Sequence, residues 1–170
     1  LAKQTFRAGS DVDVARRVFE ARLQALAGAH TLLTQSQWEN ATLAAICEQA
    51  VLVCGEARNR IARSGTDLVL SPKQALTIAL ALHELCTNAL RHGALRTDAG
   101  AISLTWEALN RRIELRWEER SEHLVSAPGV KGFGSTLLER VLPRDVSGEG
   151  AIEFDPRGVR YQLAFPMDLK

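Results

Sequence analysis

The stretch SPKQALTIALALHELCTNALRHG, residues 71–93, decides the fold, because it specifies one long buried helix. Ser71 is a suitable N-cap, Pro72 takes the first helical position, and Gln74 completes a capping box. The residues that follow are apolar nearly all round, which is typical of a helix enclosed by other elements. Gly93 provides the stop signal. We therefore expect a buried helix that ends just before this glycine.

The second half of this helix carries polar residues in an apolar setting. Glu84 and Asn88 are four positions apart and share a face, which Arg91 and His92 continue. A carboxylate in such a place is costly unless a charged or polar group meets it. Two interpretations are open. The face is either a local ion-pair cluster, with Glu84 against Arg91, or a site for Mg²⁺ that keeps several waters and phosphates.

Two further segments could bind a ligand. Gly132 and Gly134 precede a predicted helix, where backbone N–H groups can approach a phosphate closely. The same pattern also suits an ordinary flexible helix entry. The segment 117–119, Trp-Glu-Glu, ends a predicted strand. Its last carboxylate could accept a hydrogen bond from the exocyclic amine of a base, or it could simply be solvated.

The pattern along the rest of the chain predicts an α+β fold. A helical segment comes first, and an α/β sandwich follows, with helices on one face of a mixed sheet. A heptad-like stripe of Val12, Phe19, Leu23, Leu26, His30 and Leu33 marks the first helix. The remaining expected elements are a helical run over 42–53, short strands over 59–63 and 67–70, a hairpin of 101–108 with 111–118, a helix over 135–142, and a hairpin of 151–154 with 159–165.

Composition excludes several classes of function. The 170 residues include 21 Lys and Arg and 20 Asp and Glu, which gives a formal net charge of +1. This balance argues against nucleic-acid binding and against a polybasic membrane anchor. The most apolar stretch, residues 75–82, is far shorter than the roughly 20 residues that span a bilayer. We therefore expect neither nucleic acid nor a membrane among the partners of this fragment.

The cysteines indicate a reducing compartment. Cys47, Cys54 and Cys86 make an odd count without a C-x-x-C pair, so a disulfide framework or a zinc site is not expected. The default location is the cytoplasm. The first residue is Leu1, and no apolar core of a signal peptide follows it. We therefore expect the chain to be a piece of a longer protein or a processed product.

Taken in this order, the motifs resemble those of the HWE family of bacterial sensor histidine kinases. The nucleotide-binding half is similar to the GHKL, or Bergerat, ATP fold, and the resemblance covers essentially the whole chain. The matching segments are His83–Ala89 and Arg91–Leu95 for the N box, Trp117–Glu119 for the W-x-E motif, Gly132–Gly134 for the terminal glycine box, and Arg22–Trp38 for the second helix of the dimerisation and phosphoacceptor hairpin.

The resemblance implies two domains and a set of ligands. Residues 1–53 would be part of the dimerisation and histidine-phosphotransfer helices, and residues 54–170 the ATP-binding catalytic domain. ATP and Mg²⁺ are the implied cofactors. A response-regulator receiver domain is the implied partner, and the helical hairpin could form a homodimer.

The resemblance also implies roles for individual residues. Glu84 and Asn88 would be the catalytic residues and the metal ligands, with Glu84 either holding metal-bound water or accepting a proton from the incoming imidazole. Glu119 would accept from the adenine amine. The full nucleotide-binding set would be Asn88, Arg91, His92, Glu119, Lys131, Gly132, Phe133, Gly134 and Ser135.

Two features depart from the family pattern. The family's phosphoacceptor histidine lies upstream of Leu1, so no residue here is assigned that role, and His30 is expected to be a core histidine. Where the family has a small G-G-P run after W-x-E, this chain has Ser121-Glu122-His123. Two functions follow. The chain is either an ATP-dependent kinase core, which phosphorylates a histidine upstream and passes the phosphate to a response-regulator aspartate, or a phosphotransfer or scaffold protein with a degenerate fold that does not bind ATP.

Overall fold

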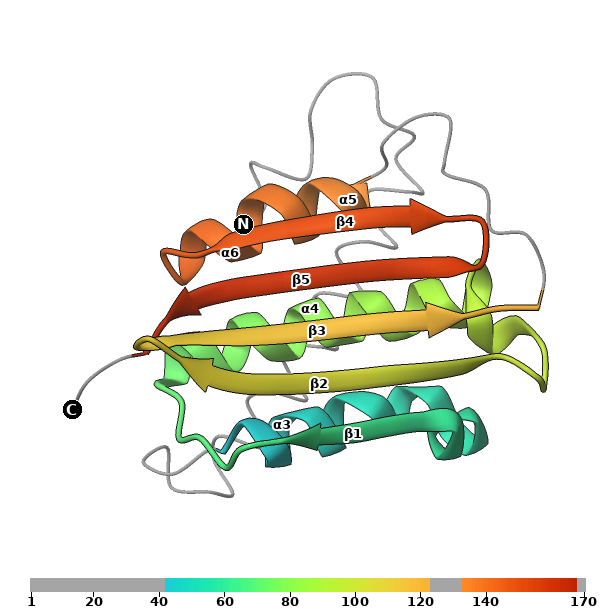
Figure 1. Ribbon diagram of the computed structural model, residues 1–170, viewed down its shortest axis with the longest axis horizontal. Helices are drawn as coiled ribbons and strands as arrows, with labels where there is room; N and C mark the ends of the chain where they lie inside the picture. The colour runs from blue at the N-terminus through green and yellow to red at the C-terminus, as the bar shows by residue number, and fades with distance from the viewer. Residues whose placement is uncertain (1–41, 123–132, 168–170) are drawn as a thin grey trace.

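The computed structural model describes residues 42–122 and 133–167, and the expected helices over residues 1–41 lie outside this range (Figure 1). The described chain contains both helices and strands. They are α3 (Leu43–Ala50), η1 (Val51–Arg60), β1 (Ile61–Gly65), α4 (Pro72–Arg91), η2 (Ala94–Arg96), β2 (Ala101–Leu109), β3 (Arg112–Arg120), α5 (Phe133–Thr136), η3 (Leu137–Val141), α6 (Leu142–Asp145), β4 (Glu149–Asp155) and β5 (Gly158–Pro166).

Five strands form one mixed sheet in the order β1-β2-β3-β5-β4. The β1 and β2 strands are parallel, and every other neighbouring pair is antiparallel. Along β3, Ile113, Leu115 and Trp117 are buried while the residues between them are more exposed, so the sheet has one apolar and one polar face. Figure 1 shows the helices together behind the sheet. This arrangement confirms the expected mixed sheet with helices on one face.

The α4 helix lies at the centre of the core, and its N-terminus has the capping box that the sequence predicts. The Ser71 hydroxyl accepts from the backbone N–H of Gln74, and the Gln74 side chain accepts from the backbone N–H of Ser71. In addition, the Gln74 amide donates to the backbone carbonyl of Pro166 at 2.9 Å. The first turn of α4 is therefore fixed to the last residues of the sheet.

Two local expectations were wrong. No strand forms over residues 67–70, where Val69 makes only an isolated bridge with Thr42, because the chain turns there directly into the α4 cap. The helical run expected over 42–53 divides into the α-helix α3 and the 3-10 helix η1, which is kinked at Gly55 (φ 56°).

The α3 helix packs into the same core as the sheet. Leu43, Ile46 and Cys47 of this helix are buried in one cluster with residues of α4 and β2. A division of the chain after residue 53 would therefore separate α3 from the core in which it lies. No helix in the described part of the chain is long and apolar enough to cross a membrane.

Candidate functional site

Glu84 and Asn88 lie side by side along α4, at the edge of its buried face. Their side chains are partly buried, whereas Leu85 and Ala89 on the adjoining face are fully enclosed. These apolar contacts fix the rotation of the helix about its axis. The helix therefore presents the carboxylate and the amide one turn apart, as their spacing predicts.

The glycine segment meets this face of α4. A Cβ atom added to Gly134 would lie 2.7 Å from the Oε1 atom of Glu84 and 3.5 Å from the Nδ2 atom of Asn88. Real Cβ atoms do not approach an oxygen so closely, so a larger residue at this position would require the Glu84 carboxylate to move. Two motifs that are about 45 residues apart in the sequence are thus in contact.

The C-terminus of α4 is closed by the backbone of Asn88. Its carbonyl accepts from the N–H groups of His92 (2.7 Å) and Gly93 (3.1 Å). The side chains of Arg91 and His92 are exposed at this end of the helix. Arg91 belongs to the last turn of α4 and His92 caps it, so both side chains are accessible to solvent at this end of the helix.

Glu119 is buried, with 7% of its surface exposed. Its Oε2 atom accepts from the backbone N–H of Ala94 at 2.8 Å, and its Oε1 atom accepts from the indole N–H of Trp117 at 3.1 Å. Burial raises the pKa of this carboxyl group, and the two hydrogen bonds partly oppose that shift. Both oxygens expected to face an adenine amine already have protein donors.

Gly93 is fitted against the same carboxylate. A Cβ atom at this position would lie 2.1 Å from Oε2 of Glu119 and 2.8 Å from the Cα atom of Ala89. The glycine after α4 therefore does more than end the helix. It makes room for the carboxylate that holds the following turn.

The turn after α4 has a second anchor, Arg60, which the sequence gave no reason to single out. Its guanidinium donates to the backbone carbonyls of Gly100 (2.8 Å) and Leu95 (3.4 Å), and also to that of Thr97. The acceptors are main-chain atoms 35–40 positions further along the chain, and they have no side-chain signature. Glu119 and Arg60 thus hold the segment after α4 from two directions.

The structure describes only some of the remaining residues of the motifs. Ser135 is buried, and Phe133 begins α5. Lys131 and Gly132 lie outside the described residues, as does His123. Burial, and secondarily the charge of Arg91, lower the pKa of His83, which favours its neutral form.

Within residues 42–122 and 133–167, no group of three or more His, Cys, Asp and Glu side chains could hold a metal ion. The cation ligands predicted from the sequence, the carboxylate of Glu84 and the amide oxygen of Asn88, are two residues and do not form such a group. Oxygen donors of this kind suit Mg²⁺, which usually takes one or two protein ligands and completes its shell with water and phosphate.

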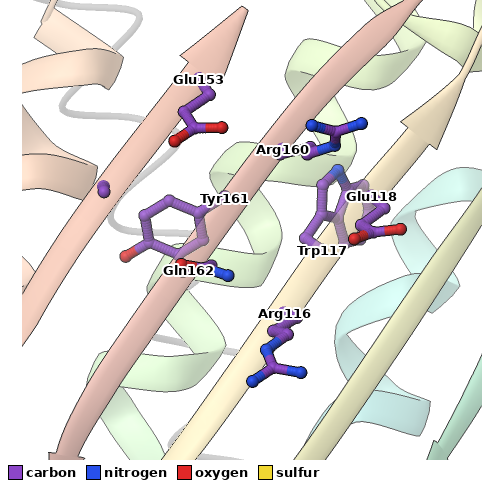
Figure 2. Close-up of a pocket in the computed structure, with 8 residues that line it drawn as sticks. Arg116, Trp117, Glu118, Glu153, Arg160, Tyr161 and Gln162 are labelled. Carbon is purple, nitrogen blue, oxygen red and sulfur yellow. The ribbon is translucent and has the colours of Figure 1, made fainter.

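A separate depression lies on the polar face of the sheet, away from the helices. Figure 2 shows its lining on β3, β5 and β4. Arg160 is paired across the strands with Glu118 on one side and Glu153 on the other. Charges of opposite sign are therefore neighbours in the register of the three strands. This depression is therefore distinct from the site on α4.

The known proteins to which the chain is similar are histidine kinases. Residues 1–67 match the family model described as HWE histidine kinase. Over 172 aligned residues, the chain is 35% identical to a blue-light-activated histidine kinase of Brucella anthropi, and 34% identical to the protein of the same description from Brucella ovis. Each alignment covers 98% of this chain but 35% of the relative. The chain thus spans about a third of the length of these curated relatives.

Solved structures share the fold. The blue-light activated histidine kinase of Erythrobacter litoralis superposes with a TM-score of 0.69 at 18% identity, over 98% of this chain and 56% of that one. The separate histidine kinase domain of that protein gives a TM-score of 0.66 at 15% identity, over 87% of this chain and 74% of that one. At such identities the likeness shows the fold alone.

Proposed function

Because the chain is homologous to histidine kinases over almost its whole length and matches the HWE family over residues 1–67, we propose that it is the ATP-binding catalytic region of a sensor histidine kinase. In this proposal it phosphorylates a histidine upstream of Leu1. The phosphate then passes to an aspartate in the receiver domain of a response regulator. A homodimer through the helical segment and a cytoplasmic location belong to the same proposal.

The observation that carries the proposal is the contact between α5 and α4. The Gly134 backbone lies against Glu84 and Asn88. The first turn of α5 and two side chains that carry oxygen atoms are therefore adjacent to one another. Backbone N–H groups at such a helix start can bind phosphate oxygens. The carboxylate and amide oxygens can bind the cation that accompanies a nucleotide. The residues present therefore fit an Mg²⁺–nucleotide complex.

In this site, ATP supplies the phosphoryl group and Mg²⁺ neutralises the charge on its phosphates. Asn88 binds the cation through its side-chain oxygen. Glu84 binds it as well, or accepts the proton that the attacking imidazole loses. Arg91 contacts phosphate oxygens at the exposed end of α4. The protein contributes mainly by positioning the reactants and neutralising charge, which are the chief requirements of phosphoryl transfer.

The glycine segment and the turn after α4 complete the proposed site. The N–H groups around Gly132 and Gly134, with Lys131 and Ser135, contact the phosphates. His92 and Phe133 border the nucleotide. Glu119 positions Ala94 through the hydrogen bond to its N–H, and a further lone pair on its carboxylate accepts from the adenine amine.

Two observations favour the second candidate, a phosphotransfer or scaffold protein that does not bind ATP. Both Glu119 oxygens have donors within the protein, which leaves little of this carboxylate exposed to a base. In addition, Glu122 places an exposed negative charge after the W-x-E motif. The two candidates differ in a directly measurable property, the affinity for ATP.

Calorimetric titration with ATP, with and without Mg²⁺, tests the proposal. We expect the wild-type chain to bind Mg²⁺–ATP more tightly than metal-free ATP. The variant Asn88→Ala removes a cation ligand, so it should lose most of this difference. Lys73→Ala, an exposed change at the other end of α4, is the control and should bind as the wild type does. Absence of ATP binding by the wild type would support the scaffold, and an equal loss with and without metal would remove Asn88 from the cation site.

A further inference from the structure

The α5, η3 and α6 elements follow one another without a break and form one helical stretch over residues 133–145. Its middle part, η3, is a π-helical turn, in which the N–H of Leu142 donates to the carbonyl of Leu137. The next residue, Pro143, has no N–H to donate. Neither of these two positions, one turn beyond Leu138, therefore supplies a hydrogen bond to the Leu138 carbonyl.

Tyr161 of β5 supplies that hydrogen bond from the sheet. Its hydroxyl donates to the carbonyl oxygen of Leu138 at 3.1 Å, and both residues are fully buried. Burial raises the pKa of the phenol, so the hydroxyl keeps its proton and remains a donor at neutral pH. Because a buried carbonyl without a donor is unfavourable, this contact fixes the place of η3 against β5.

The edge strand β4 leaves just enough room for this contact. A Cβ atom at Gly150 would lie 2.6 Å from the Leu138 carbonyl oxygen, 2.5 Å from Cγ of Pro143 and 3.3 Å from the Tyr161 hydroxyl. A larger side chain at this position would push η3 away from the sheet. The glycine therefore lets the carbonyl come within reach of the hydroxyl.

The anchored carbonyl lies close to the candidate site along the same helical stretch. Leu138 is one turn beyond Gly134, whose backbone is in contact with Glu84 and Asn88 of α4. Four residues of helix rise about 6 Å, and a hydrogen-bonded turn is stiff over such a short length. A contact that fixes Leu138 therefore also fixes the position of Gly134.

We propose that Tyr161 is a positioning residue of the nucleotide site, because its hydroxyl, through the Leu138 carbonyl, holds Gly134 where it meets Glu84 and Asn88. This inference rests on the proposed function, since the site in question is the candidate Mg²⁺–nucleotide site. Tyr161 acts through the helical stretch and not on the ligand itself.

The strand neighbour of Tyr161 has a corresponding part on the other side of the site. Tyr161 is paired across the strands with Trp117 of β3 (Figure 2). The indole of Trp117 donates to Glu119, which in turn accepts from the N–H of Ala94 in the turn after α4. Two adjacent aromatic side chains thus hold the two segments that border the C-terminal half of α4.

Calorimetric titration of the 170-residue chain with Mg²⁺–ATP tests the proposal, at a temperature at which every variant is folded. We expect Tyr161→Phe, which removes only the hydroxyl, to bind several-fold more weakly than the wild type. Ile113→Val shortens a buried side chain near the start of β3 and is the control for a loss of stability alone. It should bind as the wild type does. Hydrogen exchange of the amides over 135–142 should become several-fold faster in Tyr161→Phe only.

A second substitution tests the route through Leu138. The change Pro143→Ala provides an N–H five residues after Leu138, from which a π-helical turn can donate to the carbonyl that Tyr161 otherwise serves. In this background, Tyr161→Phe should cost much less ATP affinity than it does with the proline in place.

The outcomes separate this proposal from the proposed function. Wild-type affinity in Tyr161→Phe, or an equal loss in Ile113→Val, would overturn the positioning role and leave the hydroxyl a part of overall stability. An equal effect of Tyr161→Phe with and without Pro143 would overturn the route through Leu138. If the wild type does not bind ATP, the proposed function fails. Hydrogen exchange over 135–142 then still decides whether Tyr161 holds the helical stretch: faster exchange in Tyr161→Phe supports this anchoring, and unchanged exchange overturns it.

Discussion

The carboxylate of Glu119 accepts a hydrogen bond from the backbone N–H of Ala94 at 2.8 Å, and this contact ties the end of β3 to the turn after α4. The close fit of Gly93 against the same carboxylate shows that the turn is built around it. The end of the N box and the W-x-E motif are therefore one structural unit. Any change in the acceptor strength or the charge of Glu119 should therefore alter the stability of the turn at the end of α4.

We expect Glu119→Gln to lower the free energy of unfolding by about 1–3 kcal/mol, because an amide side chain cannot accept from both Ala94 and Trp117 without placing a donor against a buried donor. Chemical denaturation monitored by circular dichroism measures this change. Glu118→Gln is the matched control, since the neighbouring side chain is exposed on the polar face of the sheet, and it should change stability little. Equal effects of the two variants would contradict the role assigned to Glu119.

The raised pKa of Glu119 predicts a pH dependence of stability. Because the folded state binds this proton more tightly than the unfolded state, the contribution of the group to stability is complete below its ordinary pKa of 4.5 and is lost as the pH rises through the raised value. The difference in unfolding free energy between wild type and Glu119→Gln should therefore shrink as the pH increases from 4.5. A difference that grows over this range would show that the hydrogen bonds outweigh burial.

Gly134→Ala should weaken nucleotide binding by a few-fold, because the Glu84 carboxylate, whose Oε1 atom would lie 2.7 Å from the added Cβ atom, has to move away from its place in the site. Calorimetry with Mg²⁺–ATP measures the loss. Arg140→Ala, an exposed change further along the same helical stretch, should leave the affinity unchanged. Wild-type affinity in Gly134→Ala would mean that the contact between α5 and α4 does not shape the site.

Arg60→Ala should loosen the segment after α4, since three backbone carbonyls would lose their shared donor. We expect hydrogen exchange of the amides in residues 94–100 to become at least several-fold faster, while the amides of β3 keep their protection. Arg58→Ala, an exposed change two residues earlier, is the control. Unchanged exchange in 94–100 would show that Glu119 alone is sufficient to hold the turn.

The sequence predicted those parts of the fold that depend on local patterns. The capping box of α4 and the alternation of β2 and β3 are confirmed. The turn between these strands follows from Asn110, which adopts a left-handed conformation (φ 51°) as hairpin turns of this kind require. Periodicity and capping act within a few residues, so they are visible without a structure.

Long-range contacts could not be predicted in this way. Nothing in the sequence indicates that Arg60 reaches carbonyls about 40 positions later, because every residue offers the same acceptor. Likewise, the expected strand over 67–70 has a suitable composition, but within residues 42–122 and 133–167 Val69 forms only an isolated bridge with Thr42. For the site, the spacing of Glu84 and Asn88 was informative, whereas the contact of both with Gly134 required the tertiary structure.

The hydrogen bond from Gln74 to Pro166 spans 92 residues and has a consequence for synthesis on the ribosome. The first turn of α4 is made early, yet its partner on β5 is among the last residues of the described chain to be translated. Until then, β3 lacks its neighbour β5, so part of the apolar face of the sheet is missing. A chain that stalls before residue 158 would expose this face, and it would be a natural target for chaperones or proteases.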